Sequence, residues 1–233
     1  MRGFWIVVGL VVGACLFASC AMLGALPDQV ATHWNLAGQP NGWMDKLPAV
    51  MFLPALMLGL ALLLDFLPRL DPRRANILKF EKEYEQFILA LLFLLALLHL
   101  GLLSWAAGLE VPPVVLLCVG LALTFLALSR LLGAAQPNYF IGIRTPWTLE
   151  DDQNWQATNR LAARLYIWSV PVSLLGLLIP GAAPLFLLLA GLGPALIACA
   201  YSYLSFAGGT RAPAKRLAGR RRKARAGRRM RVR

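Results

Sequence analysis

Residues 86–108 read "QFILALLFLLALLHLGLLSWAAG", a run of 23 residues that contains no Lys, Arg, Asp or Glu. A helix needs about 20 apolar residues to cross the hydrocarbon core of a bilayer, and this run is long enough. Five other stretches also qualify, although Arg164 and Pro171 interrupt the fifth span. The sequence therefore predicts an all-α, polytopic membrane protein whose six transmembrane helices lie at about 4–26, 48–67, 86–108, 113–133, 161–179 and 184–206.

The composition of the chain supports the same class. Apolar residues make up 59% of its 233 residues and charged residues only 15%, whereas soluble domains carry about 25% charged residues. The first apolar run is longer than the roughly 7–15 residues of a signal peptide's hydrophobic core, so we expect a retained helix. All four cysteines lie in predicted spans without a CxxC pair, which indicates packing residues rather than a zinc site or disulfides.

The net charge of +12 comes from a single segment. Residues 1–210 carry 11 basic and 11 acidic side chains, whereas residues 211–233 carry 12 Lys and Arg and no acidic residue. Such a segment cannot build a core, so we expect a disordered basic tail that is attracted to anionic membrane lipids. Without a folded reading module, no specific nucleic-acid partner is predicted.

The positions of the basic residues predict the orientation, because Lys and Arg favour the cytoplasmic ends of spans. With six spans and both termini inside, every Lys and Arg except Lys46 falls on the cytoplasmic side. We therefore expect a multi-pass protein with cytoplasmic N and C termini, made of a six-helix membrane domain over residues 1–210 and a tail over 211–233. Residues 27–46 then form an outward-facing loop.

This outward loop, "PDQVATHWNLAGQPNGWMDK", is polar and rich in aromatic and turn-forming residues. His33, Trp34 and Asn35 offer a titratable ring, a stacking surface and an amide, so they are candidates for contact with an extracellular peptide or a lipid head group. The alternative is a structural cap, in which Trp34 anchors at head-group depth and the two polar side chains satisfy backbone groups of a turn.

Two ionisable side chains lie inside predicted spans, where such groups are costly and are therefore candidates for function. His99 could meet His33 and an outer carboxylate in a zinc site. However, no HExxH-like spacing is present, and a neutral histidine that bonds a neighbouring helix explains His99 equally well. Asp65 has Arg69 one turn away as a local partner. The sequence predicts no cofactor and no resident metal.

The second informative segment is "AAQPNYFIGIRTPWTLEDDQNWQATNRLAARLY", residues 134–166, between the fourth and fifth spans. Thr148, followed three residues later by Asp151, is typical of a capping box. We therefore expect a short amphipathic helix at the inner interface that leads into the fifth span. Arg144 could bind a phosphate, a partner or Asp65, or it could clamp the loop to the bundle.

Three stretches resemble bacterial membrane-protein families. "LPDQVATHWNLAGQPNGWMDK" resembles an outer-loop motif of a widespread bacterial membrane domain, here carried by His33, Trp34, Asn35, Gly38 and Lys46. "DPRRANILKFEKEYEQF" fits the connection between the second and third helices of the SdpI family. "PNYFIGIRTPWTLEDDQNWQATNRLA" resembles that family's hallmark, and its motif residues here are Asn138, Tyr139, Gly142, Arg144, Thr145, Pro146, Trp147, Trp155 and Arg160. The chain departs from the family at Asn159 and Ala163, where histidine and glycine are frequent.

The resemblance implies a protein of the bacterial inner membrane that gives immunity to an exported, membrane-active peptide toxin by binding it, without enzymatic turnover. It also allows signalling to a cytoplasmic transcriptional repressor, because the family prototype holds such a repressor at the membrane when toxin is present. Two alternatives stay open. One is a carrier for a lipid or small amphiphile with His99, Asp65 and Arg144 along its path; the other is a metal-dependent membrane enzyme, which requires His33 and His99 to converge.

Overall fold

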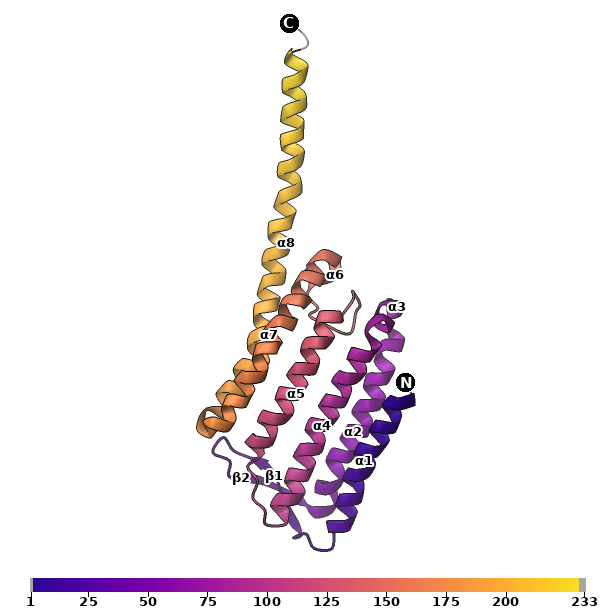
Figure 1. Cartoon of the computed structure of the whole chain (residues 1–233), viewed down its shortest axis with the longest axis vertical. Coiled ribbons are helices and arrows are strands. Elements are labelled where there is room, and N and C mark those ends of the chain that lie inside the picture. The colour runs from indigo at the N-terminus through magenta and orange to yellow at the C-terminus, as the bar shows by residue number, and fades with distance from the viewer. Residues whose placement is uncertain (1, 231–233) are drawn as a thin grey trace.

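The computed structural model describes the backbone of residues 2–230 and the side chains of residues 3–208. Long helices lie side by side, with a two-stranded hairpin at one end of the bundle and a folded loop at the other (Figure 1). The elements in chain order are α1 (Arg2–Met22), β1 (Gln29–Trp34), β2 (Pro40–Asp45), α2 (Lys46–Phe66), η1 (Leu67–Leu70), α3 (Arg74–Ile77), η2 (Leu78–Phe80), α4 (Glu81–Ala106), α5 (Pro113–Ala134), α6 (Pro146–Glu150), α7 (Asp152–Leu178), η3 (Pro180–Ala182) and α8 (Ala183–Met230).

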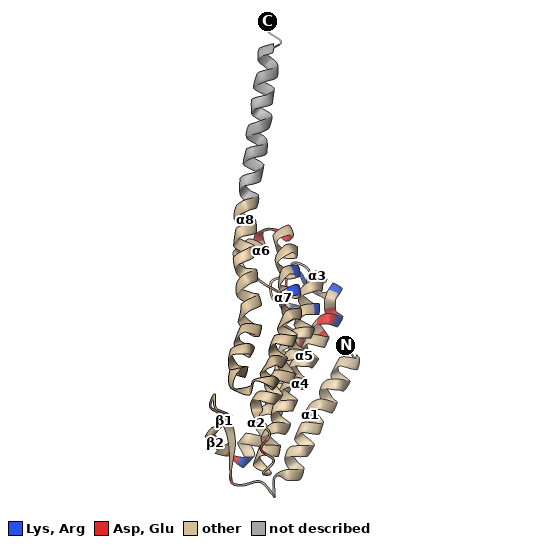
Figure 2. Ribbon diagram, turned by 60° about the vertical axis from the view of Figure 1, so that its left-hand side comes forward, with Lys and Arg blue, Asp and Glu red and all other residues tan. Residues whose placement is uncertain are grey.

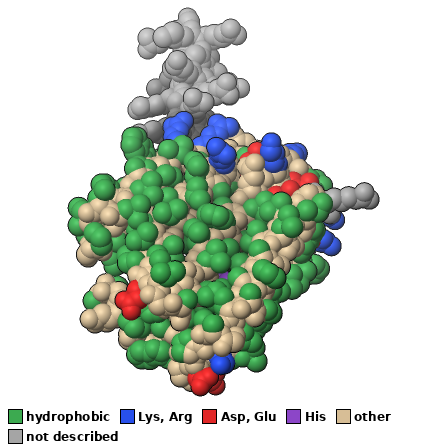
Figure 3. All heavy atoms as spheres, turned by 60° about the horizontal axis from the view of Figure 1, so that its bottom comes forward, with side chains coloured by type: hydrophobic (Ala, Val, Ile, Leu, Met, Phe, Trp, Pro, Cys, Tyr) green, Lys and Arg blue, Asp and Glu red, His purple; other side chains and the backbone are tan. Residues whose placement is uncertain are grey.

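Six helices within the described residues are long and apolar enough to cross a membrane, which confirms the predicted six-span organisation. Their outer surfaces carry large apolar side chains, as Figure 3 shows for one face; Leu10 and Phe17, for example, are 68% and 76% exposed. Such surfaces suit a lipid environment rather than water. The prediction of a disordered tail over residues 211–233 is not met in the described backbone, because α8 continues as a helix to Met230; the side chains beyond residue 208 lie outside the described ones.

The helices pack in a row rather than around one axis. α1 and α2 pack against α4, and α4 packs against α5, which in turn contacts α7; α7 then packs against α8. Glycines allow the close approach of α4 and α5. A Cβ added at Gly101 would lie 2.2 Å from Leu116 Cδ1, and one at Gly120 would lie 2.4 Å from Leu94 Cδ1. α4 therefore joins the two halves of the membrane domain.

We call the end with β1 and β2 the hairpin end, and the end with residues 135–151 the loop end. At the hairpin end, the prediction of an all-α fold is incomplete, because the expected loop is an antiparallel hairpin in which Gln29 pairs with Asp45 and Trp34 with Pro40. An isolated two-stranded hairpin is marginally stable. Here it is supported by packing, because Val30 is buried in a cluster with residues of α2 and α4, among them Val50 and Leu102.

At the loop end, the prediction that a helix begins at Thr148 is wrong. The short helix α6 begins after Thr145, which caps it, and Asp151 caps α7 by accepting a hydrogen bond from the Gln153 amide at 2.8 Å. α7 then runs unbroken past Pro171. Trp155 is fully buried against the bundle, so this part of α7 packs against its neighbouring helices.

Candidate functional site

The turn of the hairpin is held by Asn35. Its side-chain Oδ1 accepts hydrogen bonds from the backbone amides of Ala37 and Gln39, at 2.9 and 3.0 Å. Gly38 has a φ of +76°, a left-handed conformation that glycine adopts without steric cost. Asn35 therefore satisfies backbone groups of the turn, as the structural alternative expected, and Gly38 supplies the left-handed residue of that turn.

The base of the hairpin is closed by charged side chains. Lys46 Nζ lies 3.0 Å from Asp28 Oδ1, and the Lys46 amide donates to the Asp28 carbonyl at 2.9 Å. The Gln29 side chain donates to the Asp45 carboxylate. These contacts fix the position at which β2 passes directly into α2, and they place Lys46 at the start of that helix.

His33 and Trp34 are neighbours at the end of β1 with different surroundings. The His33 ring is exposed, and its Nδ1 lies 2.5 Å from the side-chain oxygen of Asn41 on β2. Trp34 is half-buried and meets Trp105 of α4 edge to face, with ring centroids 5.5 Å apart. Its Nε1 is buried without a hydrogen-bond partner among the described residues. A buried, unpaired donor costs about 1–3 kcal/mol, so a bound acceptor at this position would stabilise the complex.

His33 and Trp34 line a cavity of about 520 Å³ beneath the hairpin. This volume lies in the range of ligand sites, about 300–1,000 Å³. We call it the hairpin cavity. Its remaining wall is almost entirely apolar and comes from the hairpin and from α2, α4 and α5: Thr32, Met44, Ala49, Phe52, Leu53, Leu98, Gly101, Leu102, Pro113, Leu116 and Leu117. Such a cavity can bind an apolar chain that carries a polar group near the hairpin.

His99 lies apart from this cavity in a buried hydrogen-bond network. Its Nε2 lies 2.9 Å from Ser19 Oγ and 3.3 Å from the Cys15 carbonyl, and Ser19 Oγ also bonds the Val50 carbonyl at 3.0 Å. The network links α4 to α1 and α2. His33 bonds Asn41 instead, and within the described residues no group of three His, Cys, Asp or Glu side chains is placed to hold a metal ion.

The inner-loop motif builds a compact polar core at the loop end, and Asn138 is at its centre. Asn138 is 1% exposed. Its Nδ2 donates to the carbonyls of Gln136 and Ile141, both at 2.8 Å. Its Oδ1 accepts from the amides of Phe140 and Ile141, at 2.9 and 2.7 Å. One side chain thus satisfies four backbone groups and holds the loop in a single shape.

Gly142 and Trp155 join this loop to α7. Gly142 has a φ of +124°, and a Cβ there would lie 2.8 Å from Asn159 Oδ1 and 3.0 Å from Trp155 Cζ2. Trp155 Nε1 donates to the Ala135 carbonyl at 3.1 Å. Asn159, where the family often has histidine, accepts from the Ile143 amide at 2.8 Å. In this chain the position therefore carries a structural amide.

The Thr145–Pro146–Trp147 part of the motif joins the loop to α8. Thr145 and Thr148 form a reciprocal capping box, with Pro146 in the first turn of α6. Thr145 Oγ1 also lies 3.0 Å from Ser202 Oγ. Trp147 packs against Tyr203 with ring centroids 5.0 Å apart. Thr145 is itself buried. This part of the motif therefore packs the loop against α8.

Four motif residues are exposed at the loop end: Tyr139, Arg144, Pro146 and Arg160. Tyr139 is 44% exposed and its ring lies beneath the Arg73 guanidinium, 5.4 Å from it. Arg144 is exposed and its Nη1 donates to the Tyr139 carbonyl at 2.5 Å, so it braces its own loop. Asp71, which sequence reasoning missed, is buried beside Tyr139 and accepts from the Tyr139 amide at 2.7 Å.

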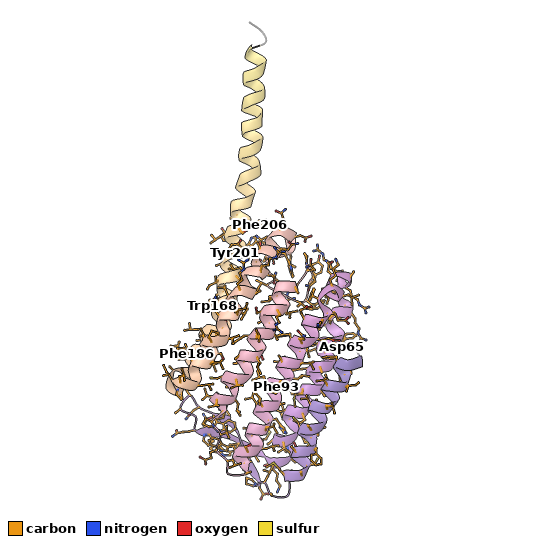
Figure 4. All side chains as sticks on the ribbon, viewed as in Figure 1. Asp65, Phe93, Trp168, Phe186, Tyr201 and Phe206 are labelled. Atoms are coloured by element: carbon orange, nitrogen blue, oxygen red, sulfur yellow. The ribbon has the colours of Figure 1, made fainter. Side chains whose placement is uncertain are left out.

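The polar residues proposed for a carrier path do not meet. Asp65 lies near the loop end of α2 (Figure 4), where it pairs with Arg69 one turn later. Arg144 bonds its own loop, and His99 bonds α1. Sequence reasoning also missed Asn154, whose Nδ2 donates to the backbone carbonyl of Ser202 at 2.9 Å and so joins α7 to α8. Because any residue supplies a backbone carbonyl, no sequence signal identifies this partner.

Comparisons with known proteins find matches to two parts of the chain, one that includes the inner-loop motif and one that includes the hairpin. Residues 134–202 match the SdpI/YfhL protein family, and residues 10–58 match a domain of unknown function, DUF1648. The chain is 25% identical over 158 residues to the immunity protein SdpI of Bacillus subtilis (strain 168), and the aligned part covers 68% of this chain and 73% of that protein. No solved structure matches the chain. The predicted resemblance to the SdpI family is confirmed.

Proposed function

We propose that this chain is a membrane immunity protein that binds an exported, membrane-active peptide at its hairpin end and neutralises it by binding alone. The observation that carries the proposal is the hairpin cavity, because its lining joins an apolar wall to His33 and Trp34. The similarity to a protein named as an immunity protein supports the biological role. The repressor partner expected from the resemblance stays a prediction.

The proposal requires the hairpin end to face outward. Lys and Arg gather around α3 and the loop end, whereas the hairpin end carries few (Figure 2). Basic residues favour the cytoplasmic side of a membrane, so this distribution supports a cytoplasmic loop end. A peptide that arrives from outside would then meet the hairpin first.

Binding rather than turnover fits the chemistry of the described residues. The wall of the hairpin cavity contains no carboxylate, thiol or lysine that could act as a nucleophile or general base. His33 is its one titratable lining group, and it bonds an amide rather than a catalytic partner. At the loop end, Asn138 and Asn159 are engaged in hydrogen bonds with backbone groups that shape the fold.

Trp34→Ala is expected to weaken protection without lowering the amount of folded protein. Trp34 forms part of the cavity wall and carries the unpaired Nε1, so its loss removes both contact area and a donor. Aromatic residues at the centre of an interface contribute about 2 kcal/mol or more, roughly a 30-fold change in affinity. His33→Ala should act in the same direction but less strongly, because the His33 ring is exposed.

The measurement is made in the bacterium that encodes the chain, after deletion of its gene. Deleted cells that carry wild-type or variant chains are exposed to the concentrated peptide fraction of the parent strain's spent medium, and growth is followed against dose. Trp168→Ala is the matched control, because Trp168 is 71% exposed on α7 and lies far from the hairpin (Figure 4). The deleted strain being as resistant as the parent would contradict the immunity role. Full protection by Trp34→Ala would contradict the role of the hairpin cavity.

A further inference from the structure

A second cavity lies at the loop end. It measures about 230 Å³ and its wall comes from α2, η1, α4, α5, α7 and the inner loop: Leu64, Leu67, Tyr84, Phe87, Leu128, Leu131, Leu132, Phe140, Ile141, Gly142, Ile143 and Tyr166. We call it the loop cavity. Its wall is also mainly apolar, and three of the helices that line it, α2, α4 and α5, also line the hairpin cavity.

The two cavities lie on the same faces of these helices. α4 contributes Tyr84 to the loop cavity and Leu102 to the hairpin cavity. α5 contributes Leu131 to the loop cavity and Pro113 to the hairpin cavity. Each pair is 18 residues apart. At 3.6 residues per turn, 18 residues make five full turns and return to the same face. Ala49 at the start of α2 and Leu67 just beyond its end show the same spacing.

The two cavities, together with the stretch between them, extend over about the thickness of a membrane. On α4 their outermost lining residues lie 18 helical residues apart, a rise of about 27 Å, and the hydrocarbon core of a bilayer is about 30 Å thick. Leu60, Leu91 and Leu121 occupy the same helix faces between the two cavities, and each is only half-buried. We call the two cavities, together with the half-buried apolar faces of α2, α4 and α5 between them, the α2–α5 groove.

Charge at the hairpin end restricts the occupant of the groove. Asp28, Asp45 and Glu110 lie in the two connections near the hairpin end, against Lys46 as the single basic residue there. At the other end of the bundle, acidic and basic side chains lie together (Figure 2), so an excess of one sign is found at the hairpin end. An apolar segment whose outward end carries basic residues would be complementary to this arrangement.

From these observations we infer that the α2–α5 groove binds a single apolar peptide helix that spans both leaflets and carries basic residues at its outward end. This inference rests on the proposed function and adds how the peptide is held. A lipid acyl chain enters from one leaflet and would fill one end of the groove. A helix of about 20 residues reaches both cavities and contacts α2, α4 and α5 along their common faces.

The test uses three phenylalanines that differ in position. Phe52 lines the hairpin cavity, Phe87 lines the loop cavity, and Phe93 lies on the opposite face of α4 beside Leu126 and Arg130. Each is replaced in the full chain by p-benzoylphenylalanine, a photoreactive analogue of similar shape. Living cells that carry these variants receive the peptide fraction described above and are irradiated, and the cross-linked product is identified by mass spectrometry.

We expect the same peptide to be cross-linked at Phe52 and at Phe87, and no peptide adduct at Phe93. Peptide captured at Phe52 alone would overturn the spanning mode and leave immunity at the hairpin end intact. Phospholipid adducts at both groove positions, without peptide, would also overturn it and show that lipid fills the groove. Peptide captured equally at all three positions would mean nonspecific contact and would overturn the groove as the site. Resistance in the dose assay is measured for each variant, so a failure of immunity is separated from a failure of the binding mode.

Discussion

Gly142→Ala is expected to destabilise the protein more than any other single methyl addition at the loop end. The φ of Gly142 is +124°, and the added Cβ would lie 2.8 Å from Asn159 Oδ1 and 3.0 Å from Trp155 Cζ2. A strained backbone conformation costs about 1–3 kcal/mol and overpacking costs about as much again, so the expected loss is about 2–6 kcal/mol. The Trp155 ring is fully buried and cannot move aside without disturbing α7.

The measurement is the thermal unfolding of detergent-purified protein, together with its yield from membranes. Gly38→Ala is the matched control, because Gly38 also has a positive φ, of +76°, but a Cβ added there would have no neighbouring atom within 4 Å. We expect Gly38→Ala to cost about 1–2 kcal/mol, the backbone contribution alone. Equal unfolding temperatures for Gly142→Ala and the wild type would contradict the tight packing of the loop on α7.

Asn138→Ala is expected to have the second large effect, because it removes four hydrogen bonds at once. The amides of Phe140 and Ile141 and the carbonyls of Gln136 and Ile141 lose their side-chain partner. A buried polar group left unpaired costs about 1–3 kcal/mol, and water at the membrane surface would recover part of this, so we expect a loss of about 2–6 kcal/mol. The loop should also become accessible to protease.

Limited proteolysis of membrane vesicles with the loop end accessible measures that opening directly. Asn76→Ala serves as the control, because Asn76 contacts the same loop through one hydrogen bond to the Pro137 carbonyl, at 2.8 Å. We expect rapid cleavage near residues 136–143 in Asn138→Ala and slow cleavage in Asn76→Ala. Identical cleavage rates for Asn138→Ala and the wild type would show that Asn138 does not hold the loop.

The six spans could be predicted from the sequence because a run of about 20 apolar residues is typical of a transmembrane helix. The hairpin could not, because "QVATHW" and "PNGWMD" are short and their stability comes from α2 and α4 beneath them. At the loop end, Thr145 followed by Pro146 was the better signal for a helix start, since proline is favoured in the first turn. Thr148 attracted the prediction because acidic residues follow it.

The candidate site was only partly predictable, because its wall is formed by the packing of several helices. His33 and Trp34 stood out as polar and aromatic residues between two spans, and both line the hairpin cavity. The apolar wall could not be assigned, because Leu98 and Leu116 look like any other leucines in a span. Which helix faces meet depends on packing, and close contacts such as Gly101 against Leu116 set that register.

Native mass spectrometry of the full chain tests the central claim most directly. The protein is extracted gently from membranes of the bacterium that encodes it, after exposure to its own exported peptides, and is compared with the Trp34→Ala variant. We predict a complex whose extra mass equals one apolar peptide and which is depleted in Trp34→Ala. Wild-type chains that carry only phospholipid or no ligand, in cells that they protect, would contradict immunity by peptide capture.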